Sequence, residues 1–374
     1  MASLPEKVGR IIGFLQGTPK GKAERIPEIR RILQVKLWAI GEVIFTTPAV
    51  RQLRQGFPGA EIDYLVGRTA APVLENNPYI NNLIIEDEHT FLTPQPTTAL
   101  ALLARLQKKK YDLLLLYHHT LFFNLYFRVV GAKLLVGIDR RGEGGPLYLA
   151  SKMDESLHQA DEYSQVPALL GAVDDGEGME IFVRNGELTR ASELLALHHL
   201  KKKFAIIAPG GGVNPKTEML DKRLPLAVFV GTAKELLHMG FDIVIIGGNG
   251  DEEVCIQMEQ TLTDSGVVNL CGRTNLRELF ALLSLADMVV ANDSAVAHAA
   301  AALRRPQVTL FGPTSPVRVN PYRNPRGSFV ASSVSCAPCY HDARLADCEH
   351  HNCLRDYGSQ EVIAVIREIL TKKG

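Results

Sequence analysis

Residues 287–315 read DMVVANDSAVAHAAAALRRPQVTLFGPTS, in which an alanine-rich segment separates two apolar segments. Residues 287–291 and 307–311 are near-continuous apolar runs of strand length, and residues 295–303 have a helical pattern. A strand, a helix and a second strand in this order form a parallel unit whose strands are buried on both faces. The stretch therefore predicts a parallel α/β sheet.

Two longer stretches, at about 34–183 and 204–311, repeat this alternation. The predicted strands are 33–38, 61–66, 82–86, 112–117 and 133–138 in the first stretch, and 204–208, 242–248, 267–270, 287–291 and 307–311 in the second. The predicted helices are 48–56, 97–109, 225–239, 252–262, 276–285, 295–303 and, near the C-terminus, 360–370. We expect two Rossmann-like domains of parallel sheet, joined near residues 187–203.

Composition narrows the class of protein. A chain of 374 residues is long enough for two or three domains, and its 46% hydrophobic and 22% charged residues are ordinary for a soluble globular protein. Lys and Arg number 41, as do Asp and Glu, so the net charge is zero and no nucleic-acid partner is expected. Six cysteines and the lack of a signal-like or membrane-spanning apolar run predict a cytoplasmic protein without a disulfide framework.

Residues 1–36 are locally basic, with eight Lys or Arg against three Glu. Val8, Ile11, Ile12 and Leu15 recur there at helical spacing. This pattern fits a helix on the anionic inner face of the cytoplasmic membrane. The same pattern fits slightly better with a solvated tail, or with a helix that packs on the rest of the protein.

A glycine loop follows the predicted strand 204–208. Gly210, Gly211 and Gly212 would let the backbone approach a ligand closely, and Lys222, just before the predicted helix 225–239, can reach a phosphate. The alternative is an ordinary glycine turn with a surface lysine, which the loop alone favours.

A polar run follows the predicted strand 287–291. Asp293 or Ser294 can cap the next helix, which is the simpler interpretation. The same geometry can bind a diphosphate through the free N–H groups at the helix start, with Ser294 and His298 as further donors.

Glu42 falls in the loop predicted between strand 33–38 and helix 48–56. A carboxylate at the carboxyl edge of a sheet can act as a general base. It can also simply favour the dipole of the helix that follows.

Taken together, these loops resemble the glycosyltransferase family that contains the lipopolysaccharide heptosyltransferases (glycosyltransferase family 9). The resemblance covers about residue 33 to the end. It rests on four motifs in family order: KLWAIGEVIFTTPAVRQLRQGFPGAEIDYLVG, PGGG followed by KRLP, DSAVAHAAAAL and FGPTSP.

The resemblance implies a GT-B fold, with two Rossmann-like domains facing a central cleft. It implies inverting, metal-independent transfer of a sugar, usually from ADP-heptose, to a lipid A–core glycolipid. Glu42 would be the catalytic base. The donor-binding residues would be Gly210, Gly211, Gly212, Lys222, Asp293, Ser294, Ala295, Val296 and His298.

The chain departs from the family pattern at two positions. Gly41-Glu42 stands where the family usually has Gly-Asp, and Ala295 stands where it has Gly. We expect an N-terminal extension at 1–32, an acceptor domain at 33–186, a donor domain at 187–345 and a cysteine-containing segment with a helix at 346–374.

Four late cysteines, Cys336, Cys339, Cys348 and Cys353, have spacings that can make a tetrahedral zinc site. We predict a structural zinc there, with reduced thiols or disulfides of oxidised protein as the alternatives. Catalysis itself is expected to need no cofactor.

Two other functions remain open. One is an oxidoreductase or epimerase on the same architecture, but residues 247–253, GGNGDEE, lack the spacing of a dinucleotide fingerprint. The other is a catalytically degenerate family member that binds a nucleotide sugar or glycolipid, for which the departures at Glu42 and Ala295 are the support.

Overall fold

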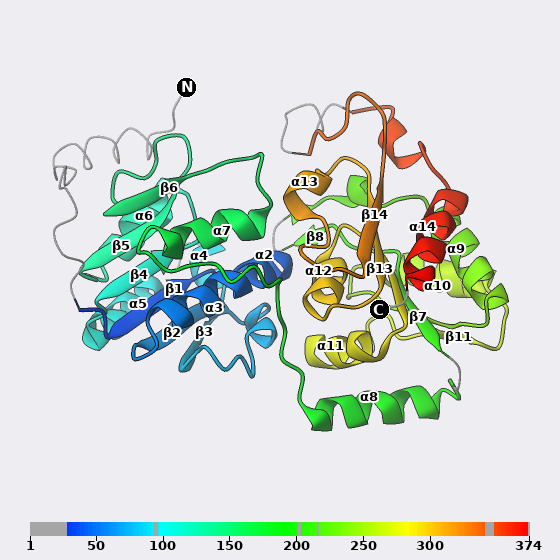
Figure 1. Ribbon diagram of the computed structural model, residues 1–374, viewed down its shortest axis with the longest axis horizontal. Coiled ribbons are helices and arrows are strands. Elements are labelled where there is room, and N and C mark those ends of the chain that lie inside the picture. The colour runs from blue at the N-terminus through cyan, green and yellow to red at the C-terminus, as the bar shows by residue number, and fades with distance from the viewer. Residues whose placement is uncertain (1–27, 93–95, 201–202, 215–216, 341–347, 373–374) are drawn as a thin grey trace. The chain divides into compact units, whose positions relative to one another are not determined.

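The computed structural model describes residues 28–92, 96–200, 203–214, 217–340 and 348–372 (Figure 1). The basic N-terminal segment, for which a membrane-bound helix was one of the interpretations, therefore lies outside the described residues except for residues 28–36. The chain divides into two compact units, Met1–Glu177 and Gly178–Gly374.

Unit 1 contains a six-stranded sheet in which every neighbouring pair of strands is parallel. Its strands are β1 (Arg31–Val35), β2 (Glu61–Gly67), β3 (Asn82–Glu86), β4 (Leu113–Leu116), β5 (Leu134–Asp139) and β6 (Leu149–Lys152). Its helices are α2 (Ile40–Phe45), α3 (Thr47–Gly56), η1 (Ala71–Val73), α4 (His89–Leu92), α5 (Pro96–Lys109), α6 (Leu121–Arg128) and α7 (Gln159–Ala168).

Unit 2 contains a second six-stranded parallel sheet. Its strands are β7 (Phe204–Ala208), β10 (Asp242–Ile245), β11 (Val267–Asn269), β12 (Met288–Asn292), β13 (Gln307–Phe311) and β14 (Gly327–Ala331), with a separate antiparallel pair, β8 (Val213–Asn214) and β9 (Thr217–Glu218). Its helices are α8 (Asn185–Leu197), η2 (Leu220–Lys222), α9 (Leu226–His238), α10 (Glu252–Thr261), α11 (Leu276–Leu285), α12 (Ala295–Ala302), α13 (Pro316–Val319), η4 (Asn352–Leu354) and α14 (Ser359–Thr371).

The strand order is the same in both units. It is β3-β2-β1-β4-β5-β6 in unit 1 and β11-β10-β7-β12-β13-β14 in unit 2, which is the Rossmann order 3-2-1-4-5-6 twice. In this order the first and fourth strands of each sheet are neighbours, and the following strands are added outward from them in opposite directions. Ligands bind outside the carboxyl ends of these two strands. The loops after β1 and β4, and after β7 and β12, are therefore the places to look for sites.

Both cores are made by the apolar strands that the sequence predicts. Leu114, Leu116 and Phe127 are among the buried residues of unit 1, and Ile207 and Phe229 are among those of unit 2. The C-terminal helix α14 packs against α9, and its Val362, Ile363 and Ile366 belong to the unit 2 core (Figure 1). The segment predicted as 346–374 thus contributes to the same core as the rest of unit 2.

The α/β fold with two parallel sheets is confirmed, and several local predictions need correction. Residues 187–203 are not a simple linker, because α8 occupies Asn185–Leu197 and packs against α11. The predicted domain limit between residues 186 and 187 falls in the first turn of α8, whereas the units divide after Glu177. Strands β6 and β14, which close one edge of each sheet, were not predicted.

Within the described part of the chain, no helix combines the length and the apolarity needed to span a bilayer.

Candidate functional site

In unit 1 the loops after β1 and β4 are tied together at the reversal point of the sheet. The backbone N–H of Leu37 donates a hydrogen bond of 2.9 Å to Nε2 of His118. Burial, together with the charge of Lys36, holds the pKa of His118 well below its usual value. The imidazole is therefore neutral and can act as the acceptor.

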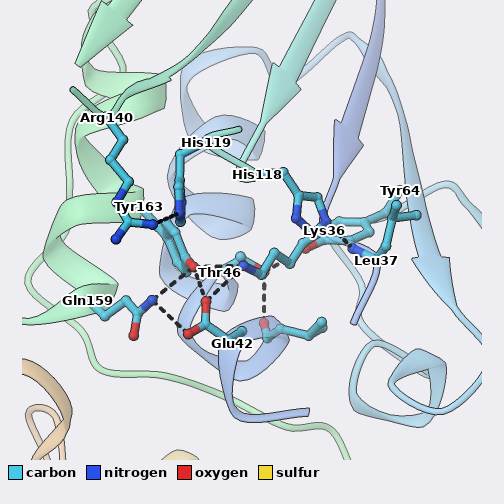
Figure 2. A network of polar contacts seen from close by, with 11 residues as sticks. Lys36, Leu37, Glu42, Thr46, Tyr64, His118, His119, Arg140, Gln159 and Tyr163 are labelled. Atoms are coloured by element: carbon cyan, nitrogen blue, oxygen red, sulfur yellow. Dashed lines mark hydrogen bonds and ion pairs between the residues drawn. The ribbon is translucent and has the colours of Figure 1, made fainter. Parts of the chain in front are cut away.

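Glu42 lies at this edge, in a network of polar side chains (Figure 2). Its Oε2 is 2.8 Å from Nζ of Lys36 and also accepts a short hydrogen bond from the hydroxyl of Tyr163. Its Oε1 accepts a hydrogen bond of 2.8 Å from Nε2 of Gln159. Three residues thus fix the position of both carboxylate oxygens.

The Tyr163 hydroxyl joins the other members of the network. It accepts hydrogen bonds from Nζ of Lys36 at 2.9 Å and from Nε2 of Gln159 at 3.1 Å, while it donates to Glu42. Its hydrogen-bonding capacity is fully used. Burial, followed by the Glu42 charge, holds the pKa of Tyr163 well above its usual value, so the hydroxyl keeps its proton.

The network also determines the charge of Glu42. Burial alone would raise the pKa of this carboxyl, but the charge of Lys36 and the hydrogen bonds from Lys36, Tyr163 and Gln159 lower it to about 2. The side chain is still 30% exposed. Glu42 is therefore an ionised carboxylate that a ligand can reach at neutral pH.

The local backbone differs from the sequence prediction at Glu42. A loop was predicted there, whereas Glu42 lies in the first turn of the short helix α2. Ala39 caps this helix with a φ of 64°, a left-handed conformation that is uncommon for a residue with a side chain. Lys36 and Glu42 lie on either side of this position and are in contact.

A pair of basic side chains and a cluster of aromatic rings also lie at this edge of unit 1. Nη1 of Arg140, after β5, lies 3.1 Å from Nε2 of His119, after β4. The ring of Trp38 packs on those of His118 and Phe123, with centroids 4.7 and 5.3 Å apart.

In unit 2 the glycine loop after β7 has the conformation that requires glycine. Gly211 and Gly212 have φ values of 109° and 82°, where side chains are strained. A Cβ atom on Gly210 would lie 2.2 Å from Cγ of Asp251, and one on Gly211 would lie 3.0 Å from Cβ of Ser294. The loop therefore passes directly over Ser294.

Asn292 ties the loops after β7 and β12 together, at the reversal point of the second sheet. Its Nδ2 donates to the carbonyl oxygens of Pro209 and Gly210, at 2.8 and 3.0 Å. Its Oδ1 accepts from the backbone N–H of Leu224 at 3.1 Å. The segment that carries Lys222 is thereby held beside the glycine loop.

Asp293 brings the predicted lysine and histidine together. Its Oδ2 lies 2.9 Å from Nζ of Lys222, and its Oδ1 lies 3.3 Å from Nε2 of His298. Burial would raise the pKa of Asp293, but Lys222 and His298 hold it well below its usual value. The three side chains form a polar cluster at the start of α12, in which Asp293 and His298 are buried and Lys222 is partly exposed.

Ser294 is the N-cap of α12, but its side chain makes no capping hydrogen bond. Its Oγ is buried without a hydrogen-bond partner among the described residues. Ala295 is the first residue of the helix, and Val296 packs against the small buried side chains of Ala208, Ala291 and Ala297. The start of α12 thus combines backbone N–H groups with an unused hydroxyl, as an anion site requires.

Asp251 and Arg223 support the glycine loop and were not predicted. Oδ1 of Asp251 accepts from the N–H of Gly211 at 3.0 Å and from Nη2 of Arg223 at 2.6 Å. Nε of Arg223 donates to the carbonyl of Gly211 at 2.8 Å. Pro225, predicted as the first helical residue, is the N-cap of α9.

The four late cysteines are all free thiols. Burial, followed by the neighbouring Cys339, Cys336 and Cys348, raises the pKa of the Cys353 thiol to about 11. Among the residues that the structure describes, no three His, Cys, Asp or Glu side chains are arranged to hold a metal ion. The zinc prediction is therefore without structural support there.

Comparison with known proteins identifies the family. The sequence model of glycosyltransferase family 9 (heptosyltransferase) matches residues 99–350. Lipopolysaccharide heptosyltransferase 3 of Escherichia coli K12 is 25% identical over 81% of this chain and 88% of its own length. The chain spans about half the length of the first curated relatives it matches, the lipooligosaccharide heptosyltransferases 2 of Campylobacter jejuni, at 30 and 27% identity.

Solved structures share the whole fold. A glycosyl transferase of family 9 from Veillonella parvula superposes with a TM-score of 0.82 at 22% identity, covering 92% of this chain and 98% of the other. The E. coli ADP-heptose lps heptosyltransferase II superposes with a TM-score of 0.73 at 22% identity, covering 91 and 98%. The fold is thus of the GT-B type, and the match to the family model over most of the chain establishes that this protein belongs to glycosyltransferase family 9, the heptosyltransferase family.

Proposed function

We propose that this protein transfers a heptose from ADP-heptose to a lipopolysaccharide core acceptor, with inversion at the anomeric carbon. The observation that carries the proposal is the cluster of Lys222, Asp293 and His298 beside the glycine loop and the start of α12. Relatives named as lipopolysaccharide and ADP-heptose heptosyltransferases support the choice of sugar and acceptor.

The donor diphosphate would bind in unit 2. The N–H groups at the start of α12, the Ser294 hydroxyl and the Lys222 ammonium supply positive potential at one place. When the bond between the sugar and the diphosphate breaks, ADP leaves with the electron pair and gains negative charge. Groups fixed in advance at that position stabilise the transition state more than the bound substrate.

The acceptor would be activated in unit 1. As the acceptor oxygen forms its bond to the anomeric carbon, its proton passes to the Glu42 carboxylate. A base with a pKa of about 2 is weak, so proton transfer becomes favourable only late, when the new bond has made the hydroxyl strongly acidic. Lys36 and Tyr163 keep the carboxylate ionised and in place until that point.

We further propose that the transfer needs no metal ion. Lys222 and the N–H groups at the start of α12 would bring to the diphosphate the positive charge that a metal ion otherwise supplies. A structural zinc at the four late cysteines is kept as a separate proposal. It rests on the spacing of the four cysteines in the sequence, and the sulfurs would have to move together around the ion.

Peripheral binding to the inner face of the cytoplasmic membrane is a further proposal. Leu100 of α5 and Phe122 of α6 are 64 and 56% exposed. Tyr126 connects them, because its hydroxyl bonds to the carbonyl of Ala99 and its ring stacks on Phe122. The lysines that end α5 are also exposed, and interfacial proteins combine exposed apolar and basic side chains.

The alternative is a degenerate family member that binds the donor or the glycolipid without turnover. Turnover is favoured by the ionised, accessible Glu42 and by the contact of Lys222 with Asp293 at the proposed donor site. The decisive experiment is mass spectrometry of the core glycolipid from a deletion strain, combined with transfer from ADP-heptose by the purified protein. A core that lacks one heptose, together with transfer in vitro, is expected; an unchanged core and no transfer would contradict the proposal.

A further inference from the structure

Residues 336–353 carry the four late cysteines. One aromatic ring of this segment contacts Lys222 in the proposed donor site. Tyr340 directly follows Cys339 in the sequence, and Nζ of Lys222 lies 4.6 Å from the centroid of its ring. The same ammonium is 2.9 Å from Oδ2 of Asp293. Lys222 is thus held between a carboxylate and the negative face of a π system, with only 15% of its side chain exposed.

The backbone around Tyr340 is anchored to the loop that follows β13. The N–H groups of Cys339 and Tyr340 both donate to the carbonyl of Pro313, at 2.9 and 3.0 Å. A side chain on Gly312 would collide with Leu354, whose Cδ2 would lie 2.5 Å from the new Cβ. Cys339 and Tyr340 on one side of residues 341–347, and Leu354 on the other side, therefore pack on this loop.

The later part of the segment also touches the short helix η2, which ends at Lys222. Nε2 of His351 lies 3.5 Å from Oδ1 of Asp221, the residue before Lys222. The segment thus contacts Lys222 by a ring and its neighbour by an imidazole. Neither contact was visible in the sequence, because more than a hundred residues separate the two regions.

We propose that Tyr340 is a positioning residue that holds the Lys222 ammonium where the donor diphosphate binds. This inference rests on the proposed donor site. A lysine side chain has four flexible bonds, and fixing its ammonium before the ligand arrives removes part of the entropy cost of binding. A single ring contact also leaves the ammonium able to hydrogen-bond to phosphate, which a second carboxylate would not.

The test measures ADP binding by calorimetry to the full chain. Tyr340→Leu removes the π face and should weaken ADP binding by about three- to tenfold, the range of a partly desolvated cation–π contact. Tyr340→Phe and Tyr340→Trp keep the face and should retain near-native affinity. Phe329→Leu is the matched control, because the Phe329 ring packs on Phe311, and its ADP affinity should be unchanged.

A double-mutant cycle separates this inference from the donor site itself. In a Lys222→Met background, Tyr340→Leu should cause no further loss. If Lys222→Met leaves ADP affinity at the native value, the donor site is wrong. If Lys222→Met weakens binding but Tyr340→Leu does not, or weakens it equally in both backgrounds, the positioning role is wrong and the donor site stands.

A second series covers the case in which Tyr340→Leu does not fold. Phenylalanines of increasing fluorination at position 340 keep the shape of the ring while reducing the negative charge on its face. ADP affinity should fall stepwise with fluorination. An affinity that is constant across folded variants would overturn the proposal.

Discussion

The Lys36 ammonium lies 2.8 Å from Oε2 of Glu42, six residues farther along the chain. The lysine is buried and the glutamate is partly exposed. The pair thus keeps the ammonium inside the protein while part of the carboxylate side chain stays accessible.

Glu42→Gln should lower kcat by roughly 10²–10⁴-fold, because the amide keeps the size of the side chain but removes its basicity. Donor affinity should change little. Steady-state kinetics with varied ADP-heptose and calorimetry with ADP check both parts. Near-native turnover would place the base elsewhere, and a loss of donor binding would make Glu42 structural.

Glu42→Asp should retain measurable activity, because it restores the residue usual in the family. The shorter side chain cannot reach Lys36, Gln159 and Tyr163 equally well, so we expect a kcat below the native value. Complete inactivity with an intact fold would contradict this expectation.

The pH profile of kcat/KM should report the Lys36–Glu42 pair. With a pKa of about 2, Glu42 stays ionised and causes no loss of activity between about pH 5 and 8. In Lys36→Met burial is no longer opposed by the lysine, so the pKa of Glu42 should rise above its usual value of about 4.3. An acid limb should then appear, while Lys36→Arg should keep the native profile. Identical profiles in all three proteins would refute the role of the lysine.

The same pair should affect stability. The pKa of Glu42 is lower in the folded than in the unfolded chain, so its contribution is present above about pH 4.3 and is lost as the pH falls toward 2. Urea unfolding between pH 3 and 6 should show this dependence in the native protein. It should be weaker in Glu42→Gln, whose side chain does not titrate.

Lys222→Ala and His298→Ala should each weaken donor binding or turnover by at least an order of magnitude, about 1.4 kcal/mol. Lys222→Ala also leaves Asp293 with one partner fewer, so thermal unfolding must be measured alongside the kinetics. Unchanged kinetics in both variants, with the fold intact, would remove the donor assignment.

Elemental analysis should settle the cysteine site. Protein purified without chelator or affinity metal is expected to contain near-stoichiometric zinc, and removal of the zinc should destabilise the C-terminal segment without directly stopping transfer. Metal-free protein that has four titratable late thiols and an unchanged unfolding temperature would contradict the zinc proposal.

Sedimentation with vesicles tests the membrane proposal. Native protein should bind vesicles that contain anionic lipid, and the double variant Leu100→Ser with Phe122→Ser should bind several-fold less, because about two exposed apolar side chains are lost. Turnover of a soluble acceptor fragment should stay the same. Equal binding of both proteins would rule out this surface.

The sequence was sufficient for the sheets because their strands are buried on both faces and so read as apolar runs. Strands β6 and β14 escaped prediction because they lie at sheet edges, where LASK and GSFVA are partly exposed and weakly apolar. Helix α8 escaped because only Ala191 and Leu195 of its residues are buried.

The proximity of Lys222, Asp293 and His298 could be predicted because they lie in two short motifs with recognisable turns. The partners of Glu42 could not. Gln159 and Tyr163 are four residues apart on one face of α7, which is visible in the sequence, but nothing local pairs that face with a carboxylate 117 residues earlier. Only tertiary packing makes that contact, as it does for Tyr340 and Lys222.

The repeated strand order has a consequence for how specificity can change. Every described side chain that holds Glu42 belongs to unit 1, and every one that holds Lys222 belongs to unit 2. Each unit therefore carries its own support for the residue that is proposed to act in it. Substitutions that retune one substrate need not disturb the other, so halves from different members could be recombined by protein engineers, or by evolution, as interchangeable modules.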